Sequence, residues 1–118
     1  MDILGYKFKN NDFLKVALTH SSYANEKHCR CNERLEFLGD SVLSIIVSDY
    51  LFHNMPKMDE GDLSKIRASL VCEQSLASFA EKLELGDKLL LGKGEDATGG
   101  RKRFSILSDA FEAVLAAI

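Results

Sequence analysis

The chain has 118 residues, of which 46% are hydrophobic and 28% charged, and its formal net charge is −3 at pH 7. This composition fits one globular domain over residues 1–118 and excludes a disordered or fibrous chain. No apolar run is long enough for a transmembrane helix, and the N-terminus lacks the pattern of a signal peptide, so we expect neither. An acidic balance argues against a nucleic-acid binder, unless clustered acids bind cations that change the local sign.

The three cysteines, Cys29, Cys31 and Cys72, are too few and too irregularly spaced for a disulfide framework. We therefore expect free thiols and a cytoplasmic protein. Residues 28–31 read His-Cys-Arg-Cys, which suggests a zinc site, but no second pair with ligand spacing follows. Free thiols in a loop are the expected state of this segment.

The first half of the chain alternates helical and polar segments. Apolar residues at helical spacing predict a short helix over residues 11–19. A polar loop is expected over residues 20–32, with His20 as a structural histidine because no nucleophile accompanies it. A long acidic and apolar helix is expected over residues 33–54, closed by Pro56 and largely buried because most of its circumference is apolar.

The second half predicts two further helices, over residues 63–72 and 73–85, followed by a loop over residues 92–103 that lacks the Gly-Lys-Ser/Thr pattern of a nucleotide-binding loop. The basic run Arg101-Lys102-Arg103 in that loop fits phosphate contacts and a solvated surface equally well. A last helix begins at Ser105 and shows no stop signal, so we expect the chain to be part of a longer protein. No stretch predicts a convincing strand, and the expected class is all-α.

The long helix carries three acids, Glu33, Glu36 and Asp40, at positions i, i+3 and i+7. At ~100° per residue they fall within about 60° of one another. Clustered acids on an apolar helix need positive compensation, and a divalent cation is the obvious candidate. Gly39 lies inside the same helix, where glycine is tolerated if another group approaches the backbone closely.

The last helix carries a second acidic pair, Asp109 and Glu112, on one face. If the two acidic helices pack together, oxygen ligands without His or Cys favour Mg²⁺ or Mn²⁺. Such a site suits phosphodiester hydrolysis with two ions at ~4 Å separation. Each acidic set taken alone also fits a solvated helix face, and Asp109 also fits a helix-start residue favoured by the helix dipole.

Residues 33–41 read Glu-Arg-Leu-Glu-Phe-Leu-Gly-Asp-Ser, which resembles the signature of bacterial ribonuclease III. Further matches to this family lie in residues 18–24, in residues 60–64 with 67–68, and in residues 105–113. The resemblance implies a ribonuclease III endonuclease-domain-like helical bundle that cleaves double-stranded RNA with Mg²⁺, for which Mn²⁺ can substitute. It further implies 5′-phosphate and 3′-hydroxyl products with short 3′ overhangs, a role in rRNA and mRNA processing, and a homodimer with no membrane or nucleotide cofactor.

The resemblance also implies roles for single residues, carried over by their positions in the motifs. The residues that correspond to the family's metal-binding acids are Glu36, Asp40, Asp109 and Glu112. Of these, Asp40 and Glu112 correspond to the catalytic residues. Glu33 and Glu60 match auxiliary acids, and Phe37 matches an apolar residue that packs into the second copy.

In the family, the endonuclease domain continues beyond the position of residue 118, and a double-stranded RNA-binding domain normally follows. That second domain supplies many of the positively charged contacts with RNA. Two alternatives to an active ribonuclease remain. One is a non-catalytic ribonuclease III-like module for dimerisation or RNA binding, although none of the expected acids is missing. The other is a different Mg²⁺ phosphohydrolase. Such enzymes usually add His ligands, and no His lies near the acids of either helix.

Overall fold

The computed structural model describes residues 2–3 and 5–118. Its described part is all-α in class, as expected, apart from one short antiparallel pair of strands, β1 (Asp2–Ile3) and β2 (Tyr6–Lys7). The expectation of no strand was therefore wrong at this pair, which spans two residues on each side. The helices are α1 (Asn11–Ala17), α2 (Ser21–Lys27), α3 (Glu33–Asn54), α4 (Glu60–Leu70), α5 (Glu73–Lys82), α6 (Leu85–Lys88), α7 (Lys93–Ala97), the 3₁₀ helix η1 (Gly100–Lys102) and α8 (Phe104–Ala117).

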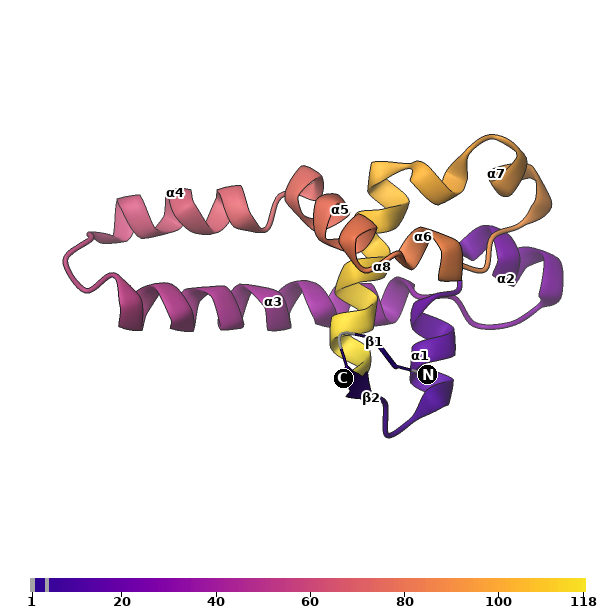
Figure 1. Ribbon diagram of the computed structural model, residues 1–118, viewed down its shortest axis with the longest axis horizontal. Helices are drawn as coiled ribbons and strands as arrows, with labels where there is room; N and C mark the ends of the chain where they lie inside the picture. The colour runs from indigo at the N-terminus through magenta and orange to yellow at the C-terminus, as the bar shows by residue number, and fades with distance from the viewer. Residues whose placement is uncertain (1, 4) are drawn as a thin grey trace.

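The molecule consists of a compact body and an arm, and measures 51 × 31 × 23 Å along its principal axes (Figure 1). Helix α3 begins in the body and continues into the arm, where α4 runs back beside it. The turn between the two helices contains Pro56, which cannot continue a helix, and Asp59, whose carboxylate accepts from the backbone N–H of Asp62 at the start of α4.

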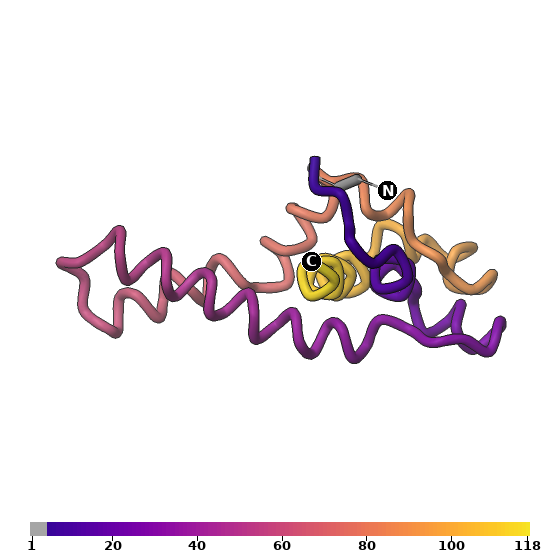
Figure 2. Tube along the Cα trace, turned by 90° about the horizontal axis from the view of Figure 1, so that it is seen from below, coloured from indigo at the N-terminus to yellow at the C-terminus, as the bar shows by residue number. Residues whose placement is uncertain are grey.

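The core of the body surrounds α8, which Figure 2 shows end-on between α1 and α5, with α3 running beneath it. Several of the buried residues of α8 are alanines, whose small side chains let helix backbones approach closely. Its buried apolar residues are Ile106, Leu107, Ala110, Ala113, Val114 and Ala117. Helix α8 is therefore held from several sides, and any group on it is fixed relative to α3.

The expectation that α3 is largely buried was wrong. Only Gly39 and Leu51 are buried, whereas the side chains of Phe37, Ile45 and Phe52 are 80%, 69% and 68% exposed. Beyond its crossing with α8, the helix packs against α4 among the elements that the structure describes, and much of its apolar surface faces outward. Phe37, Ile45 and Phe52 form the exposed stripe of α3.

Two segments expected to be loops contain short helices. Residues 21–27 form α2, because the imidazole of His20 caps the helix by accepting from the backbone N–H of Ser22. Residues 92–103 contain α7 and η1, which are held together by ion pairs of Arg101 with Asp96 and of Arg103 with Glu95. In the described part of the chain, no helix combines the length and apolarity that crossing a membrane requires.

Candidate metal centre

Helices α3 and α8 cross where Gly39 meets Glu112. A Cβ atom built on Gly39 would collide with the backbone carbonyl of Glu112, and the carbonyl carbon lies only 2.5 Å from that position. A glycine is therefore required for the two backbones to come this close. The close approach expected at Gly39 is confirmed, and it fixes the spacing between the acids of the two helices.

The crossing brings three predicted acids together. Glu36 on α3 and Asp109 and Glu112 on α8 each offer a carboxylate oxygen, and these oxygens all lie within 4.8 Å of one another. Asp40 follows Glu36 by about one turn of α3 and lies close enough to raise the pKa of Glu112. Four acids from two helices thus meet at one place, which we call the acid cluster: Glu36, Asp40, Asp109 and Glu112.

The acid cluster is partly removed from water. Glu112 is buried, Glu36 and Asp109 are half-buried, and Asp40 is exposed. In the part of the chain that the structure describes, the ion pairs join other residues, so no Lys or Arg neutralises these acids directly. The cluster is therefore a partly buried group of acids that is open to solvent on the side of Asp40.

Burial and mutual repulsion raise the pKa values of three acids in the cluster. Burial, the hydrogen bond with Asp40 and the charges of the other acids raise the pKa of Glu112 to about 8. Burial and the charge of Asp109 raise the pKa of Glu36 to about 7. The pKa of Asp109 is also raised, first by burial and then by the charge of Glu73, against a hydrogen bond with Glu36 and the charge of His20. Perturbed acids of this kind are typical of functional sites.

The cluster suits a hard divalent cation. Its donors are carboxylate oxygens, without nitrogen or sulfur, and such donors prefer Mg²⁺ or Mn²⁺ to Zn²⁺. The positive charge of a cation would stabilise the ionised carboxylates, which the protein alone holds at unfavourable pKa values. The residues present therefore fit the metal that the sequence predicts.

The two predicted auxiliary acids lie in different places. Glu33 is exposed at the first turn of α3, near enough for its charge to raise the pKa of Glu36. Glu60 begins α4 and lines a hollow with Leu51 and Phe52 in the arm. Leu51 is eleven residues beyond Asp40, or about 16 Å along the helix at 1.5 Å per residue. Within one chain, Glu60 is therefore not brought to the acid cluster.

Two residues of the sequence that were not predicted to serve the site act on it electrostatically. Glu73 at the start of α5 raises the pKa of Asp109, and His20 lowers it. No local pattern connects Glu73 to the acids, because its proximity depends on how α5 packs on α8. His20 belongs to a segment that matches the family, but spacing alone connects it to none of the acids.

The basic run at residues 101–103 is mostly occupied with structure. Arg101 donates to the carbonyl oxygens of Gly86 and Leu89, at 3.0 and 2.7 Å, and pairs with Asp96. Arg103 pairs with Glu95 in the same way. Within this run, all of which the structure describes, only Lys102 is exposed and has no such ion pair. The run as a whole therefore does not form a free cationic surface.

Known proteins share both the sequence and the fold. Residues 10–118 match the family model described as ribonuclease-III-like. Similar relatives include ribonuclease 3 of Clostridium tetani, which is 58% identical over 95% of this chain and 48% of its own length. Ribonuclease 3 of Caldanaerobacter subterraneus subsp. tengcongensis is 56% identical over 98% of this chain and 51% of its own length.

A solved structure agrees. The nuclease domain of ribonuclease III from Campylobacter jejuni superposes with a TM-score of 0.90 at 52% identity, over 96% of this chain and 77% of the other. That structure is described as flexible in a region involved in dimer formation. The chain spans about half the length of the curated relatives it matches. By sequence, by fold and by the family model, the chain belongs to the ribonuclease-III-like family.

Proposed function

We propose that the chain is a metal-dependent endonuclease domain that hydrolyses phosphodiester bonds of double-stranded RNA to 5′-phosphate and 3′-hydroxyl ends. The observation that carries this proposal is the acid cluster at the crossing of α3 and α8, in a chain of the ribonuclease-III-like family. In a longer parent protein, the domain would serve the processing of structured rRNA and mRNA. We propose that residues 1–118 make up most of this endonuclease domain and that the longer protein completes it.

In this proposal, Glu36, Asp40, Asp109 and Glu112 hold Mg²⁺, and Mn²⁺ can take its place. A bound cation of this kind supplies a hydroxide nucleophile and stabilises the leaving oxygen. Asp40 and Glu112 act as the catalytic residues, one exposed and one buried, and Asp40 is near enough to raise the pKa of Glu112. The exposure of Asp40 leaves that side of the cluster open to a substrate.

The rigid crossing gives the four acids their common geometry. Gly39 lets the α3 backbone rest on that of Glu112, and α8 is packed in turn against α1 and α5. Carboxylates held in advance at one spacing lose little freedom when they bind a cation or a transition state. The fold therefore contributes to the reaction by positioning the acids before any substrate binds.

We further propose that the chain works as a homodimer through the exposed stripe of α3. Phe37, Ile45 and Phe52 point outward from one side of the helix, and such apolar area is costly to leave in water. A hollow of about 520 Å³ lies beside the stripe, lined by Ile45, Phe52 and Arg67 among others. It offers a place for the projecting Phe37 of a second copy.

In a homodimer, Glu60 could lie near the acid cluster of the second copy. Since Glu60 lies in the arm, far from the acids of its own chain, only the cluster of another copy could use it. The same stripe would join the arms of two copies, so each arm could extend toward the crossing of the other. Glu33, which is near the cluster of its own chain, needs no second copy for an auxiliary role.

The proposed activity is tested by incubating the chain with a radiolabelled duplex RNA, with and without Mg²⁺, beside the matched single-stranded RNA and the Glu112→Gln variant. We expect cleavage of the duplex only with Mg²⁺ and only by the wild-type chain, with 5′-phosphate ends. Duplex binding without cleavage at saturating protein and Mg²⁺ would contradict the proposal and favour a non-catalytic module.

A further inference from the structure

One polar side chain is buried where the chain enters α3. Of residues 25–38, all of which the structure describes, only Asn32 is buried, with 5% of its surface exposed. A polar side chain in such a place must exchange its contacts with water for hydrogen bonds within the protein. Asn32 lies directly before Glu33 and one helical turn before Glu36, so its contacts act on the helix that carries two members of the acid cluster.

Asn32 makes hydrogen bonds in two directions. Toward the body, its side-chain Nδ2 donates to the carbonyl oxygen of Ala17 at 3.1 Å, and its backbone N–H donates to the carbonyl oxygen of Thr19 at 2.9 Å. Toward α3, its own carbonyl oxygen accepts from the backbone N–H of Glu36 at 2.8 Å. A continuous set of hydrogen bonds therefore joins the end of α1 to the backbone of Glu36.

The side chain of Asn32 does not act as its position predicts. Asparagine is among the best residues for capping the start of a helix. Asn32 occupies the cap position of α3, yet its side chain makes no capping hydrogen bond with this helix, all of whose residues the structure describes. Its amide donates instead to Ala17, which lies fifteen residues earlier in the chain. A contact with α1 therefore replaces the local cap.

These contacts give α3 a second fixed point in the body. The first is the crossing at Gly39, whose backbone rests against the carbonyl of Glu112. A helix held at one crossing alone can rotate about that contact. Asn32 lies about 10 Å from Gly39 along the helix, at 1.5 Å per residue, and Glu36 lies between the two points. Because Ala17 is fully buried on α1, which packs against α8, Asn32 holds this end of α3 in one frame with the acids of α8.

Apolar packing at the start of α3 does not give the same control. Leu35 is partly buried and packs against the core, but apolar contacts are non-directional. Hydrogen bonds require a defined distance and angle, so those of Asn32 determine how α3 is rotated about its axis. The direction of the Glu36 side chain depends on this rotation, since successive side chains of a helix are turned by ~100°.

We propose that Asn32 is a positioning residue of the acid cluster, which holds the start of α3 to α1 and so directs the Glu36 carboxylate toward Asp109 and Glu112. This inference rests on the proposed metal-dependent function. It is supported by the geometry, since carboxylate oxygens of these three acids lie within 4.8 Å of one another. Groups that orient metal ligands typically change metal affinity about 10- to 100-fold when they are removed. A residue that only completed the hydrogen bonding of α1 would change stability and leave metal affinity as it is.

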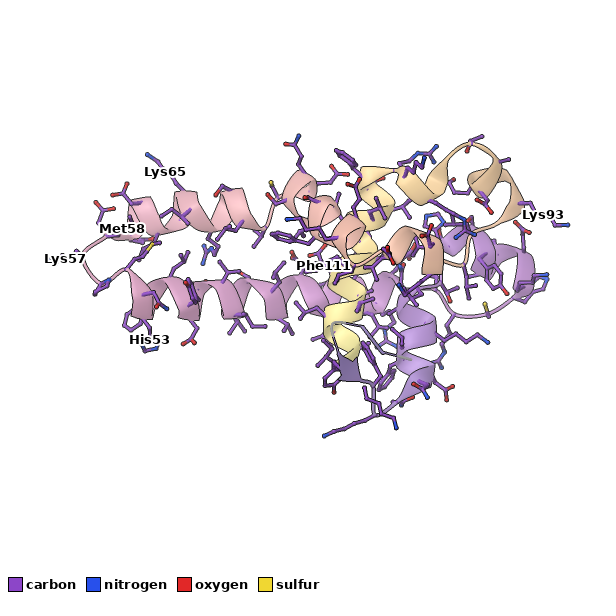
Figure 3. The ribbon with its side chains drawn as sticks, in the orientation of Figure 1. His53, Lys57, Met58, Lys65, Lys93 and Phe111 are labelled. Atoms are coloured by element: carbon purple, nitrogen blue, oxygen red, sulfur yellow. The ribbon has the colours of Figure 1, made fainter. Side chains whose placement is uncertain are left out.

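Two substitutions and two controls separate positioning from stability. Asn32→Ala removes the bond to Ala17, and so does Asn32→Ser, but a serine can cap α3 in its place. Thr19→Val is the matched control, because it removes another side-chain hydrogen bond to α1, that of the Thr19 hydroxyl with the carbonyl of Lys15 at 2.6 Å, and leaves the bonds of Asn32 in place. His53→Asn is the second control, because His53 lies on the same helix at the far end of the arm (Figure 3).

The readouts are the melting temperature and the Mn²⁺ dissociation constant, measured by calorimetry at a temperature where every variant is folded. We expect both Asn32 variants to bind Mn²⁺ about 10-fold more weakly than the wild type, although Asn32→Ser should melt at a higher temperature than Asn32→Ala. Thr19→Val should melt at a lower temperature but bind Mn²⁺ as the wild type does, and His53→Asn should match the wild type in both. Wild-type affinity in either Asn32 variant, or the same loss of affinity in Thr19→Val, would overturn the proposal.

A measurement on the wild type keeps the proposal falsifiable if the Asn32 variants do not fold. Relaxation of ¹⁵N in backbone amides reports how rigidly each residue is held on the picosecond to nanosecond timescale. Without Mg²⁺, we expect the amide of Glu36 to be as rigid as that of Glu112, and to stay so when Mg²⁺ is added. A Glu36 amide that is mobile without Mg²⁺ and becomes rigid with it would show that the cation, and not Asn32, positions the start of α3, and would overturn the proposal.

Failure of this inference can be told apart from failure of the proposed function. The metal and NMR readouts need no RNA, whereas cleavage of duplex RNA by the wild type tests the function itself. A wild type that binds Mn²⁺ but cleaves nothing would contradict the function and leave the Asn32 result standing. A wild type that cleaves, with Mn²⁺ affinity unchanged in the Asn32 variants, would contradict only the role of Asn32.

Discussion

The backbone of Gly39 in α3 rests against the backbone carbonyl of Glu112 in α8, so closely that no side chain fits between the two helices. This contact sets the distance between the acids that the two helices carry, because Glu36 and Asp40 flank Gly39 and Asp109 lies one turn before Glu112. Stability and metal binding should therefore depend on the same glycine.

Gly39→Ala is expected to destabilise the chain by about 3 kcal/mol, because the added methyl forces apart two helices in the middle of the body. It should also weaken cation binding by separating the acids. Urea unfolding and Mn²⁺ calorimetry measure the two effects. Gly94→Ala is the matched control, since a Cβ there meets nothing within 4 Å, and it should change stability by less than about 0.5 kcal/mol.

Without a divalent cation, the melting temperature should fall as the pH rises from 5 to 8. The pKa values of Glu36 and Glu112 are raised to about 7 and about 8, so the folded chain binds more protons than the unfolded chain in this range. Stability then decreases with rising pH as these protons are lost. Glu112→Gln should flatten the decrease and raise the melting temperature at pH 8. A melting temperature that rises steadily from pH 5 to pH 8 would contradict this account of the acids.

Phe37→Ala should disrupt the proposed dimer without unfolding the chain. The side chain is 80% exposed in one copy, so its removal costs the isolated fold little. Sedimentation velocity at several concentrations should show the wild type as a dimer and the variant shifted toward the monomer. Phe13→Ala is the control, because Phe13 is also exposed, at 52%, but lies on α1, away from the exposed stripe of α3. Equal association of all three proteins would contradict the assigned interface.

Arg101→Ala should destabilise the chain by about 2 kcal/mol, because it leaves the carbonyls of Gly86 and Leu89 without their donor. Lys102→Ala, one residue away and exposed, should be close to neutral in stability. Thermal or urea unfolding of the two variants tests this difference. If Arg101→Ala kept full stability, the side chain would be free for another role, such as a phosphate contact.

The sequence predicted most helices correctly, because their apolar spacing and capping residues are local signals. The limits of α3 at residues 33 and 54 agree with prediction. The sequence could not show α2, whose cap is a histidine fixed by Ser22, or α7, which depends on ion pairs with Arg101 and Arg103. These contacts join residues that no local pattern connects.

The burial of α3 was predicted wrongly for a related reason. Its apolar circumference indicates that something covers the helix, but not whether the cover belongs to the same chain. In the structure, Phe37, Ile45 and Phe52 are exposed. We therefore assign this apolar surface to the proposed dimer interface rather than to the core. Spacing likewise predicted that acids on two helices could meet, but not that Glu60 would lie in the arm.

Binding of a divalent cation by the acid cluster is tested most directly by calorimetric titration of Mn²⁺ into the wild type and Glu112→Gln at pH 8. Since burial and repulsion keep protons on Glu36 and Glu112, the same titration at pH 6 should show weaker binding and more proton release. We predict saturable binding to the wild type at pH 8 and its loss in Glu112→Gln. Equal binding by both proteins, or none by either, would contradict cation binding by the acid cluster.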